Sequence, residues 1–453
     1  MQQRFNQAVA LLHSFAYRDA ENRFQEIAAA DPKCAMAHWG AAMAYYHQLW
    51  DPRFDSGEGG LGLREVGTAA RIGAAPGREQ GFVSALQVFY QDVAIISYGR
   101  AAQAYQKAMG TVAAQNPSDP ESQIFYALAL LSSAHSDDKT HANQKQAVEI
   151  LRPLYAKYPN HPGLAHYLIH ACDNPEMAQS ALDAARAYSK IAPSAPHALH
   201  MPSHIFTQLG MWNDSIESNR AARISAREHG DIGEELHAMD YLVYAYLQSG
   251  RDDDAARVLQ ELRAMTHLNA GTFKIGYAAT AMPARYAIER RDWRSAAEVL
   301  PLDESPAQAR ALAFWARAVG FARSGRADAA NGEIAKLEAE LAKLRAAHDS
   351  YWSAQAQIQF AEAKGWIAFA GGRNQEAKTF LSKAANEEDA LEKRPVTPGP
   401  IVPAREQLGD LLLELKEPDA ARTEFQTVLK IAPGRKGALD GAARAEKMLA
   451  SQD

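Results

Sequence analysis

Apolar and small residues recur along the chain at the three- and four-residue spacing of amphipathic helices, and short breaks separate these stretches. Within each unit an aromatic residue, an alanine, a second bulky residue and a proline follow at fixed distances. The clearest instances are Tyr17, Ala20, Phe24 and Pro32 at the start of the chain and Ala421, Phe425 and Pro433 near its end. Intervening units place Ala147, Ala181, Ala255 and Ala296 at the alanine position, and Gly210 and Gly250 at the turn. The pattern predicts pairs of helices repeated along the chain.

The length of the unit indicates which kind of helix pair this is. A helix–turn–helix unit of about 34 residues with this order of Gly, aromatic, Ala and Pro is the tetratricopeptide pattern. We therefore expect an all-α solenoid, a right-handed superhelix with a concave groove. Residues 1–433 would form one continuous domain of about eleven irregular units, and residues 434–453 a capping helix and tail.

Three segments interrupt the repeat and predict insertions. They are a Gly-rich stretch at 51–63, a polar stretch at 132–145 and a Pro-rich link at 392–403. We expect solvated connecting loops, and the first is also a candidate lid over the groove. Its GEGGLG sequence follows no predicted strand, which argues against a dinucleotide-binding turn.

The most informative motif is a histidine pair that occurs twice, one repeat apart. His166 and His170 stand four residues apart, and His200 and His204 repeat the pair 34 residues later. Residues at i and i+4 leave the same face of a helix one turn apart. One helix can supply two ligands to a metal ion in this way, as in zinc-binding HExxH helices.

When the repeats are aligned with one another, these and further polar residues fall on the inner face of three consecutive units. The set is His166, His170, Asp173, His197, His200, His204, His237 and Asp240. So many histidines on one face cannot all be unpaired buried cations, and a shared metal ion is the interpretation we favour. A metal-free proton-transfer or anion-binding cluster and a coincidental lining of the groove are the alternatives. The predicted metal ligands are His166, His170, His197, His200, His204, His237 and Asp240.

Other side chains near this face are candidates for substrate chemistry. Asp240, Asp173 and Tyr244 are the predicted catalytic residues, with packing as the alternative role for Tyr244. Arg285, Tyr167 and Tyr241 are predicted to bind substrate, and Arg285 would suit a carboxylate or phosphate group. His13 and His47 could join the site only if the chain curls back, and Glu406 and Asp410 are expected on a solvated inner face.

Composition narrows the possible partners and compartments. A net charge of −6 over 453 residues gives no reason to expect nucleic acid. Cys34 and Cys172 alone make neither a disulfide framework nor a Cys-rich metal site. We see no membrane span and no secretory leader. The compartment stays open: cytoplasmic if Met1 is the native start, periplasmic or secreted if a leader was removed.

Three stretches resemble a widespread bacterial family of tetratricopeptide proteins with no assigned activity. They are CAMAHWGAAMAYYHQLW (34–50), the His-rich block at 163–250, and PVTPGPIVPAREQLGDLLLEL (395–415). The resemblance covers nearly the whole chain and implies the repeat fold.

The sequence thus predicts a metal-binding repeat protein. Its ligand set suits Zn, Fe, Cu or Mn, and the groove would hold a small or peptide-like molecule. A metal-dependent hydrolase and a non-haem metal oxidoreductase fit equally. The rival is a non-catalytic scaffold that binds a peptide or protein partner.

Overall fold

The computed structural model describes residues 1–453 except 48, 50–55, 94–97, 136–137, 394–395 and 452–453. All the regular structure of the described residues is helical, and no strand occurs among them. Each helix packs mainly on its neighbours in sequence. The predicted all-α fold of tetratricopeptide type, a stack of helix pairs, is confirmed.

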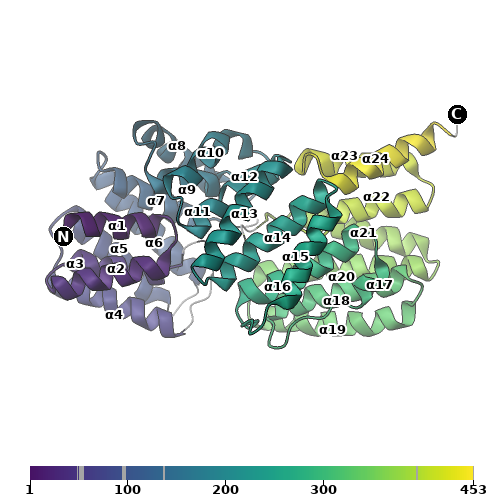
Figure 1. Ribbon diagram of the computed structural model, residues 1–453, viewed down its shortest axis with the longest axis horizontal. Helices are drawn as coiled ribbons and strands as arrows, with labels where there is room; N and C mark the ends of the chain where they lie inside the picture. Colours follow the sequence, from purple (N-terminus) through teal and green to yellow (C-terminus); the bar gives the residue numbers. More distant parts are fainter. Residues whose placement is uncertain (48, 50–55, 94–97, 136–137, 394–395, 452–453) are drawn as a thin grey trace. The chain divides into compact units, whose positions relative to one another are not determined.

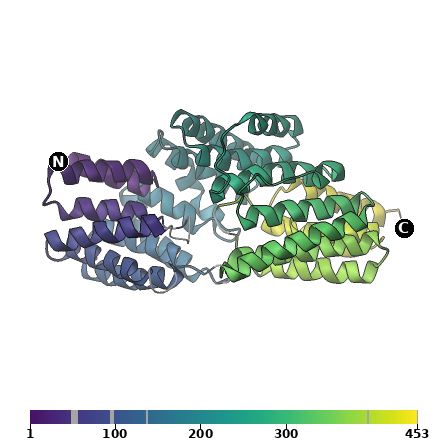
Figure 2. The same cartoon turned by 90° about the horizontal axis from the view of Figure 1, so that it is seen from below.

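The chain divides into two compact parts, Met1–Ile205 and Phe206–Asp453. From here on, the first unit and the second unit are these two parts, and not single helical repeats. The first unit contains α1 (Gln2–His13), α2 (Tyr17–Ala30), α3 (Ala35–Tyr45), α4 (Ser56–Ile72), α5 (Arg78–Val93), α6 (Tyr98–Gln115), α7 (Pro120–Ser132), α8 (Ala142–Lys157), α9 (Pro162–Ala171), the short 3-10 helix η1 (Ala178–Ala181), α10 (Leu182–Ile191) and α11 (Pro196–His200). The division falls inside α12 (Pro202–Gln208). In Figure 2 the first helices of this unit lie side by side in a stack.

The second unit continues the same arrangement (Figure 1). It contains α13 (Trp212–Glu228), α14 (Ile232–Gln248), α15 (Asp252–Ala264), α16 (Phe273–Glu289), α17 (Trp293–Ala297), α18 (Ala307–Arg323), α19 (Ala327–Ala346), α20 (Ser350–Ala370), α21 (Asn374–Asp389), α22 (Ala404–Glu414), α23 (Pro418–Ile431) and α24 (Lys436–Leu449). The last helix, α24, stands where the capping helix was predicted.

Small residues of the repeat lie where the helices pack most closely. The predicted alanine positions are no more than 1 % exposed in every case: Ala20, Ala147, Ala181, Ala255, Ala296 and Ala421. Phe24 and Phe425 are fully buried, and each ring packs on a glycine of a neighbouring helix. A β-carbon on Gly409 would lie 2.8 Å from the Phe425 ring. The repeat read from the sequence therefore places these core residues correctly.

The Gly-rich segment is the exception among the predicted loops. Residues 56–63 are helical and belong to α4, while residues 51–55 lie outside the described part of the chain. The glycines serve close packing: a β-carbon on Gly62 would lie 2.2 Å from the Tyr90 ring of α5. Low helix propensity is thus offset by tertiary contact. The other two segments join helices: α7 ends at Ser132 and α8 begins at Ala142, and α21 ends at Asp389 and α22 begins at Ala404.

Each unit brings helices from distant parts of its sequence together. In the first unit α1 packs on α9, and in the second unit α14 contacts α24. Residue 13 therefore reaches the helix that carries the first histidine pair. In the described residues no helix has both the length and the apolar character that crossing a membrane requires.

Candidate metal centre

Three imidazoles meet in the first unit, two from α9 and one from α11. The Nε2 atom of His166 lies 3.1 Å from Nε2 of His170 and 3.2 Å from Nε2 of His197. The three ligand atoms all lie within 4.8 Å of one another. We call His166, His170 and His197 the histidine triad. The i, i+4 spacing on α9 places two of them on one face, as predicted.

The opposite nitrogen of His166 is fixed by the backbone of α1. Its Nδ1 lies 2.6 Å from the carbonyl oxygen of His13 and must donate to it, because a carbonyl oxygen only accepts. A neutral His166 therefore presents a lone pair at Nε2, toward the other two rings. Metal-binding histidines usually have their second nitrogen fixed in this way.

The second predicted pair forms its own short chain of contacts, although His200 ends α11 and His204 lies on α12, and not on one helix as predicted. His200 and His204 approach through their Nε2 atoms, which lie 3.0 Å apart. The Nδ1 atom of His204 lies 2.8 Å from a carboxylate oxygen of Asp173 and donates to it. The ring centroids of His170 and His204 are 6.3 Å apart, as are those of His197 and His200. The two groups are therefore neighbours within the first unit.

The rings are buried, which differs from the open groove surface that we expected. His166, His197, His200 and His204 are 0, 4, 1 and 2 % exposed. Aromatic rings surround the triad: Phe15 stacks on His170 and His197, and Tyr188 stacks on His166. Burial, and after it the neighbouring His197, lowers the pKa of His166 well below 6.5. A neutral imidazole is the form that binds metal.

Two other predicted residues of the first unit lie near α1. His13 reaches the α9 region because α1 packs there, but its imidazole faces Tyr167, Glu121 and His161 and not the triad. The Tyr167 hydroxyl, predicted to bind substrate, is fully buried and lies 2.9 Å from Nδ1 of His13. His47 stacks on Tyr17.

The remaining predicted residues belong to the second unit. His237, Asp240, Tyr241 and Tyr244 all lie on α14 and are buried. Asp240 pairs with Arg285 of α16, with 3.6 Å between its carboxylate and the Nε atom. Burial raises the pKa of Asp240, and Arg285 acts in the opposite direction. That His237 and Asp240 complete the metal site stays a prediction.

Arg285 and Tyr241 hold the chain's own Pro-rich link. The Arg285 guanidinium donates to the carbonyl oxygens of Gly399, Pro400 and Ile401, at 2.8 to 3.3 Å. Tyr241 donates to the carbonyl oxygen of Thr397. In the second unit the residues predicted to bind a substrate thus bind a non-helical segment of the protein itself. The Tyr244 ring packs against the same guanidinium, whose central carbon lies 4.8 Å from the ring centroid.

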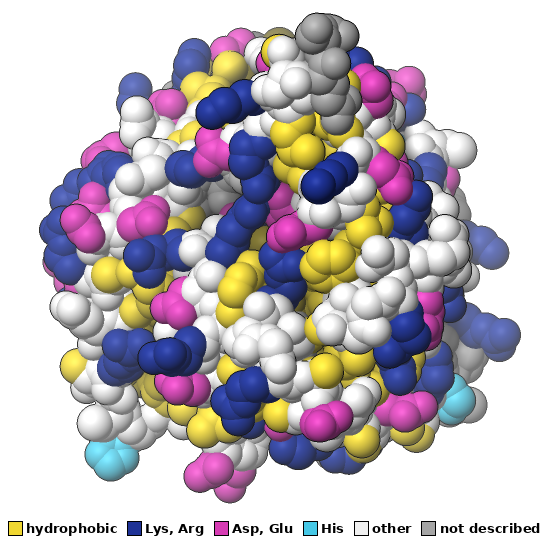
Figure 3. All heavy atoms as spheres, turned by 90° about the vertical axis from the view of Figure 1, so that its right-hand side faces the viewer, with side chains coloured by type: hydrophobic (Ala, Val, Ile, Leu, Met, Phe, Trp, Pro, Cys, Tyr) yellow, Lys and Arg dark blue, Asp and Glu magenta, His cyan; other side chains and the backbone are white. Residues whose placement is uncertain are grey.

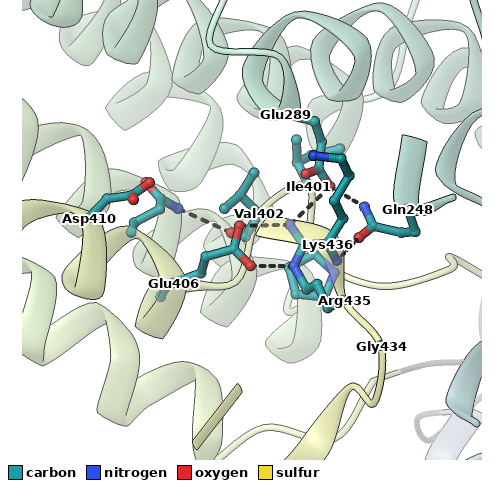
Figure 4. A network of polar contacts seen from close by, with 12 residues as sticks. Gln248, Glu289, Ile401, Val402, Glu406, Asp410, Gly434, Arg435 and Lys436 are labelled. Carbon is teal, nitrogen blue, oxygen red and sulfur yellow. Dashed lines mark hydrogen bonds and ion pairs between the residues drawn. The ribbon is translucent and has the colours of Figure 1, made fainter. Parts of the chain in front are cut away.

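The expectation for Glu406 is wrong. Its carboxylate is buried, not solvated, and lies 2.6 Å from Nε of Arg435, whose guanidinium also pairs with Glu289 at 2.9 Å (Figure 4). Arg435 stands just before α24, which packs against α22. The expected solvated inner face is covered here because Arg435 and α24 pack over Glu406. Asp410 lies at the edge of this network and pairs with Arg291 and Arg444.

The face seen in Figure 3 carries both signs of charge. Lys and Arg side chains alternate there with Asp, Glu and hydrophobic side chains. A pocket of about 460 Å³ in the second unit has the same mixed character, with Asp252, Arg291, Lys436 and Arg444 among its lining residues.

Two residues near His13 were not predicted from the sequence. Glu121 of α7 and His161, the residue before α9, contact His13. They stand 108 and 148 positions after it, and neither belongs to a recurring motif. Only the packing of α1, α7 and α9 brings them together.

Comparisons with known proteins add little beyond the fold. No protein family matches the chain, and no curated protein is recognisably similar to it. Among solved structures, the human IFIT1 dimer with PPP-AAAA is 13 % identical, covers 97 % of this chain and 95 % of its own, and has a TM-score of 0.44. Yeast Tom70 is 12 % identical over 99 % and 88 %, with a TM-score of 0.38. A tetratricopeptide repeat protein from Parabacteroides merdae ATCC 43184 is 11 % identical over 81 % and 99 %, with a TM-score of 0.29. Likenesses this distant say nothing about function.

The chain's own helix pairs and their buried small residues make it an all-helical repeat protein of tetratricopeptide type.

Proposed function

We propose that the first unit binds a divalent transition metal ion through His166, His170 and His197. The observation that carries this proposal is the convergence of three Nε2 atoms. Those of His170 and His197 lie 3.1 and 3.2 Å from that of His166. In a tetrahedral site with Zn–N bonds of about 2.0–2.1 Å, ligand nitrogens lie about 3.3 Å apart. Two of the three nitrogen pairs in the triad are close to that spacing, and all three ligand atoms lie within 4.8 Å of one another.

Hydrogen bonding alone accounts less well for this arrangement. Because the proton of His166 is on Nδ1, its Nε2 has a single lone pair in the ring plane. Both His170 and His197 direct an Nε2 atom toward it. One lone pair cannot serve two N–H donors well, whereas three lone pairs can share one cation.

The ligand set favours certain ions. Neutral imidazoles suit Zn, Cu and Fe, and the absence of thiolates disfavours Cu(I). The triad itself contains no carboxylate, since the Asp173 oxygen is turned toward His204. Zinc therefore fits it better than the two-His-one-carboxylate iron that we also considered.

Hydrolysis is the reaction that we propose for the metal-bound triad. His166, His170 and His197 would hold a zinc ion with a position left for water, and the ion would supply a nucleophile there by lowering the pKa of that water to about 7. Asp173 accepts the Nδ1 proton of His204 and so leaves Nε2 of that ring as a proton acceptor, the state that a general base needs. The substrate class is a small or peptide-like molecule with a hydrolysable carbonyl group.

The first test is elemental analysis of protein purified without a metal-affinity tag and dialysed against ZnCl2. We expect stoichiometric zinc, and one ion fewer in the His170→Ala/His197→Ala variant. His38→Ala is the matched control, because His38 lies in the same unit and bonds one carboxylate, Glu65. An unchanged zinc content in the double variant would refute the site. Zinc-dependent cleavage of chromogenic ester and amide substrates, absent from the double variant, would then test catalysis.

A scaffold function is the second candidate, and one observation favours it. The second unit already holds a non-helical segment of the chain, its own link at 396–403, through Arg285 and Tyr241. A repeat unit that binds main-chain carbonyl groups in this way suits peptide recognition. Protein that folds normally but retains no zinc after dialysis would support this candidate over the first.

A further inference from the structure

A second group of metal-ligating side chains lies in the first unit, apart from the histidine triad. It consists of His13 at the end of α1, Glu121 in the first turn of α7 and His161 at the start of α9, and we call it the His–Glu cluster. Nε2 of His13 lies 2.9 Å from one oxygen of Glu121, and Nε2 of His161 lies 3.0 Å from the other. All three ligand atoms lie within 4.8 Å of one another.

This arrangement differs from the other His–carboxylate contacts of the same unit. His38 with Glu65, His141 with Glu176 and His204 with Asp173 each join one imidazole to a carboxylate through Nδ1, and the second Glu176 oxygen contacts Lys145. In the His–Glu cluster two imidazoles contact the two oxygens of one carboxylate, and both present Nε2. The rings of His13 and His161 are also neighbours, with centroids 5.0 Å apart.

The His13 ring is held in place from several sides. Phe125 stacks on it at 4.8 Å, and the Tyr167 hydroxyl lies 2.9 Å from its Nδ1. A β-carbon on Gly163 would lie 2.6 Å from the same Nδ1, so only glycine leaves room for the ring at that position. These contacts direct Nε2 toward Glu121. They are the kind of outer contacts that orient the ligands of a metal ion.

The carboxylate is positioned by the start of its helix. Asp119 caps α7 by accepting from the backbone N–H of Ser122, and Pro120 occupies the first helical position. Glu121 follows directly. Its side chain is 29 % exposed and that of His161 is 22 % exposed, while His13 is 1 % exposed. One side of the cluster is thus closed by protein and the other is open to solvent.

We infer that His13, Glu121 and His161 form a second divalent-metal site. Two imidazoles and one carboxylate are a known ligand set of catalytic zinc and of non-haem Fe(II), and both leave coordination positions for water or substrate. The open side at Glu121 and His161 is where those positions would lie. The site shares no side-chain ligand with the triad.

Residue 13 nevertheless connects the two sites. Its imidazole belongs to the His–Glu cluster, and its carbonyl oxygen accepts the Nδ1 proton of His166 in the triad. An ion that fixes the His13 side chain would also fix the end of α1. Occupation of one site should therefore strengthen metal binding at the other.

The test is the zinc content of the full chain after dialysis against ZnCl2, measured with folding checked by circular dichroism. We expect two ions in the unaltered protein and one ion in Glu121→Gln, in His161→Gln and in the triad variant His170→Ala/His197→Ala. Combining Glu121→Gln with the triad variant should remove both. His38→Gln should keep two.

Tyr167→Phe tests the site without removing a ligand. Loss of the hydroxyl that orients His13 should weaken zinc binding at the His–Glu cluster about 10–100-fold. This variant also serves if Glu121→Gln fails to fold. The inference is overturned if the folded cluster variants keep the zinc content and affinity of the unaltered protein. If only the triad variant keeps its zinc, the His–Glu site stands and the proposal for the triad falls.

Discussion

The Nδ1 atom of His166 donates a hydrogen bond of 2.6 Å to the carbonyl oxygen of His13, a residue 153 positions earlier in the chain. This contact fixes the tautomer of the central imidazole in the triad. It also ties the end of α1 to α9. Because the acceptor belongs to the backbone, no substitution of the His13 side chain removes it directly.

The metal-free protein should lose stability as the pH falls below about 6.5. Burial lowers the pKa of His166 and of His13 below 6.5, although Glu121 partly opposes this at His13. Below pH 6.5 the unfolded chain then binds more protons than the folded one, so the free energy of unfolding decreases with falling pH. Urea midpoints measured in EDTA at pH 7.5, 6.5 and 5.5 would show the trend.

His166→Gln provides the control for this prediction. Its urea midpoint should fall less steeply over the same pH range, since one buried imidazole no longer titrates. A midpoint of the unaltered protein that stays constant or rises toward pH 5.5 contradicts the prediction. Bound zinc should be released over the same range, because protons compete for the imidazoles.

Asp173→Asn should reduce activity without removing the triad's ion. The carboxylate accepts the Nδ1 proton of His204, whereas an amide can also present a donor and so allow the other tautomer. We expect kcat to fall about 10–100-fold, as for other contacts that orient a working histidine. Zinc content should stay within error of the unaltered protein. A loss of zinc would instead identify Asp173 as a ligand.

Asp240→Ala separates two roles for this carboxylate. If Asp240 completes the metal site, as its position in the repeat predicts, zinc affinity should fall about 10–100-fold or activity should disappear. If it only balances Arg285, zinc binding should be unchanged while the free energy of unfolding falls by about 3–5 kcal/mol. Isothermal titration with ZnCl2 and urea unfolding of the same preparation decide between the two.

Two glycines of α4 should respond in opposite directions to alanine. At Gly62 a β-carbon would lie 2.2 Å from the buried Tyr90 ring, whose hydroxyl is fixed by a bond to the carbonyl oxygen of Ala42. We expect Gly62→Ala to cost about 1–3 kcal/mol. At Gly67 no atom lies within 4 Å, so Gly67→Ala should stabilise the helix by about 0.5–1 kcal/mol. Equal urea midpoints for the two variants would contradict this account of α4.

The sequence predicted the parts of the molecule that repeat. Ala20 and Phe24 could be placed because the same residue types stand at Ala421 and Phe425 near the end of the chain, and His166 and His170 could be placed because their spacing on one helix is local. Glu121 and His161 could not, since their partner His13 lies far away in sequence and only helix packing joins them.

The errors also have physical causes. The segment at 56–63 is helical because Gly62 allows α4 to approach Tyr90, a tertiary effect that outweighs low propensity. Glu406 is buried because Arg435, which stands just before α24 in the same unit, packs over it and neutralises its charge. Position within a repeat predicts which face a residue occupies, but it does not predict what covers that face.

The contact between α1 and α9 has a consequence for the newly made chain. A repeat protein usually folds by adding each helical repeat to the one before it. Helix α1, in contrast, completes its packing only when α9, some 150 residues later in the chain, has been made. The triad also needs His197 of α11, and at about 5–20 residues per second the ribosome takes on the order of ten seconds to reach it. If the triad binds metal as proposed, loading can begin only after most of the first unit has been synthesised. Until then the face of α1 that later packs on α9 is uncovered and available to chaperones.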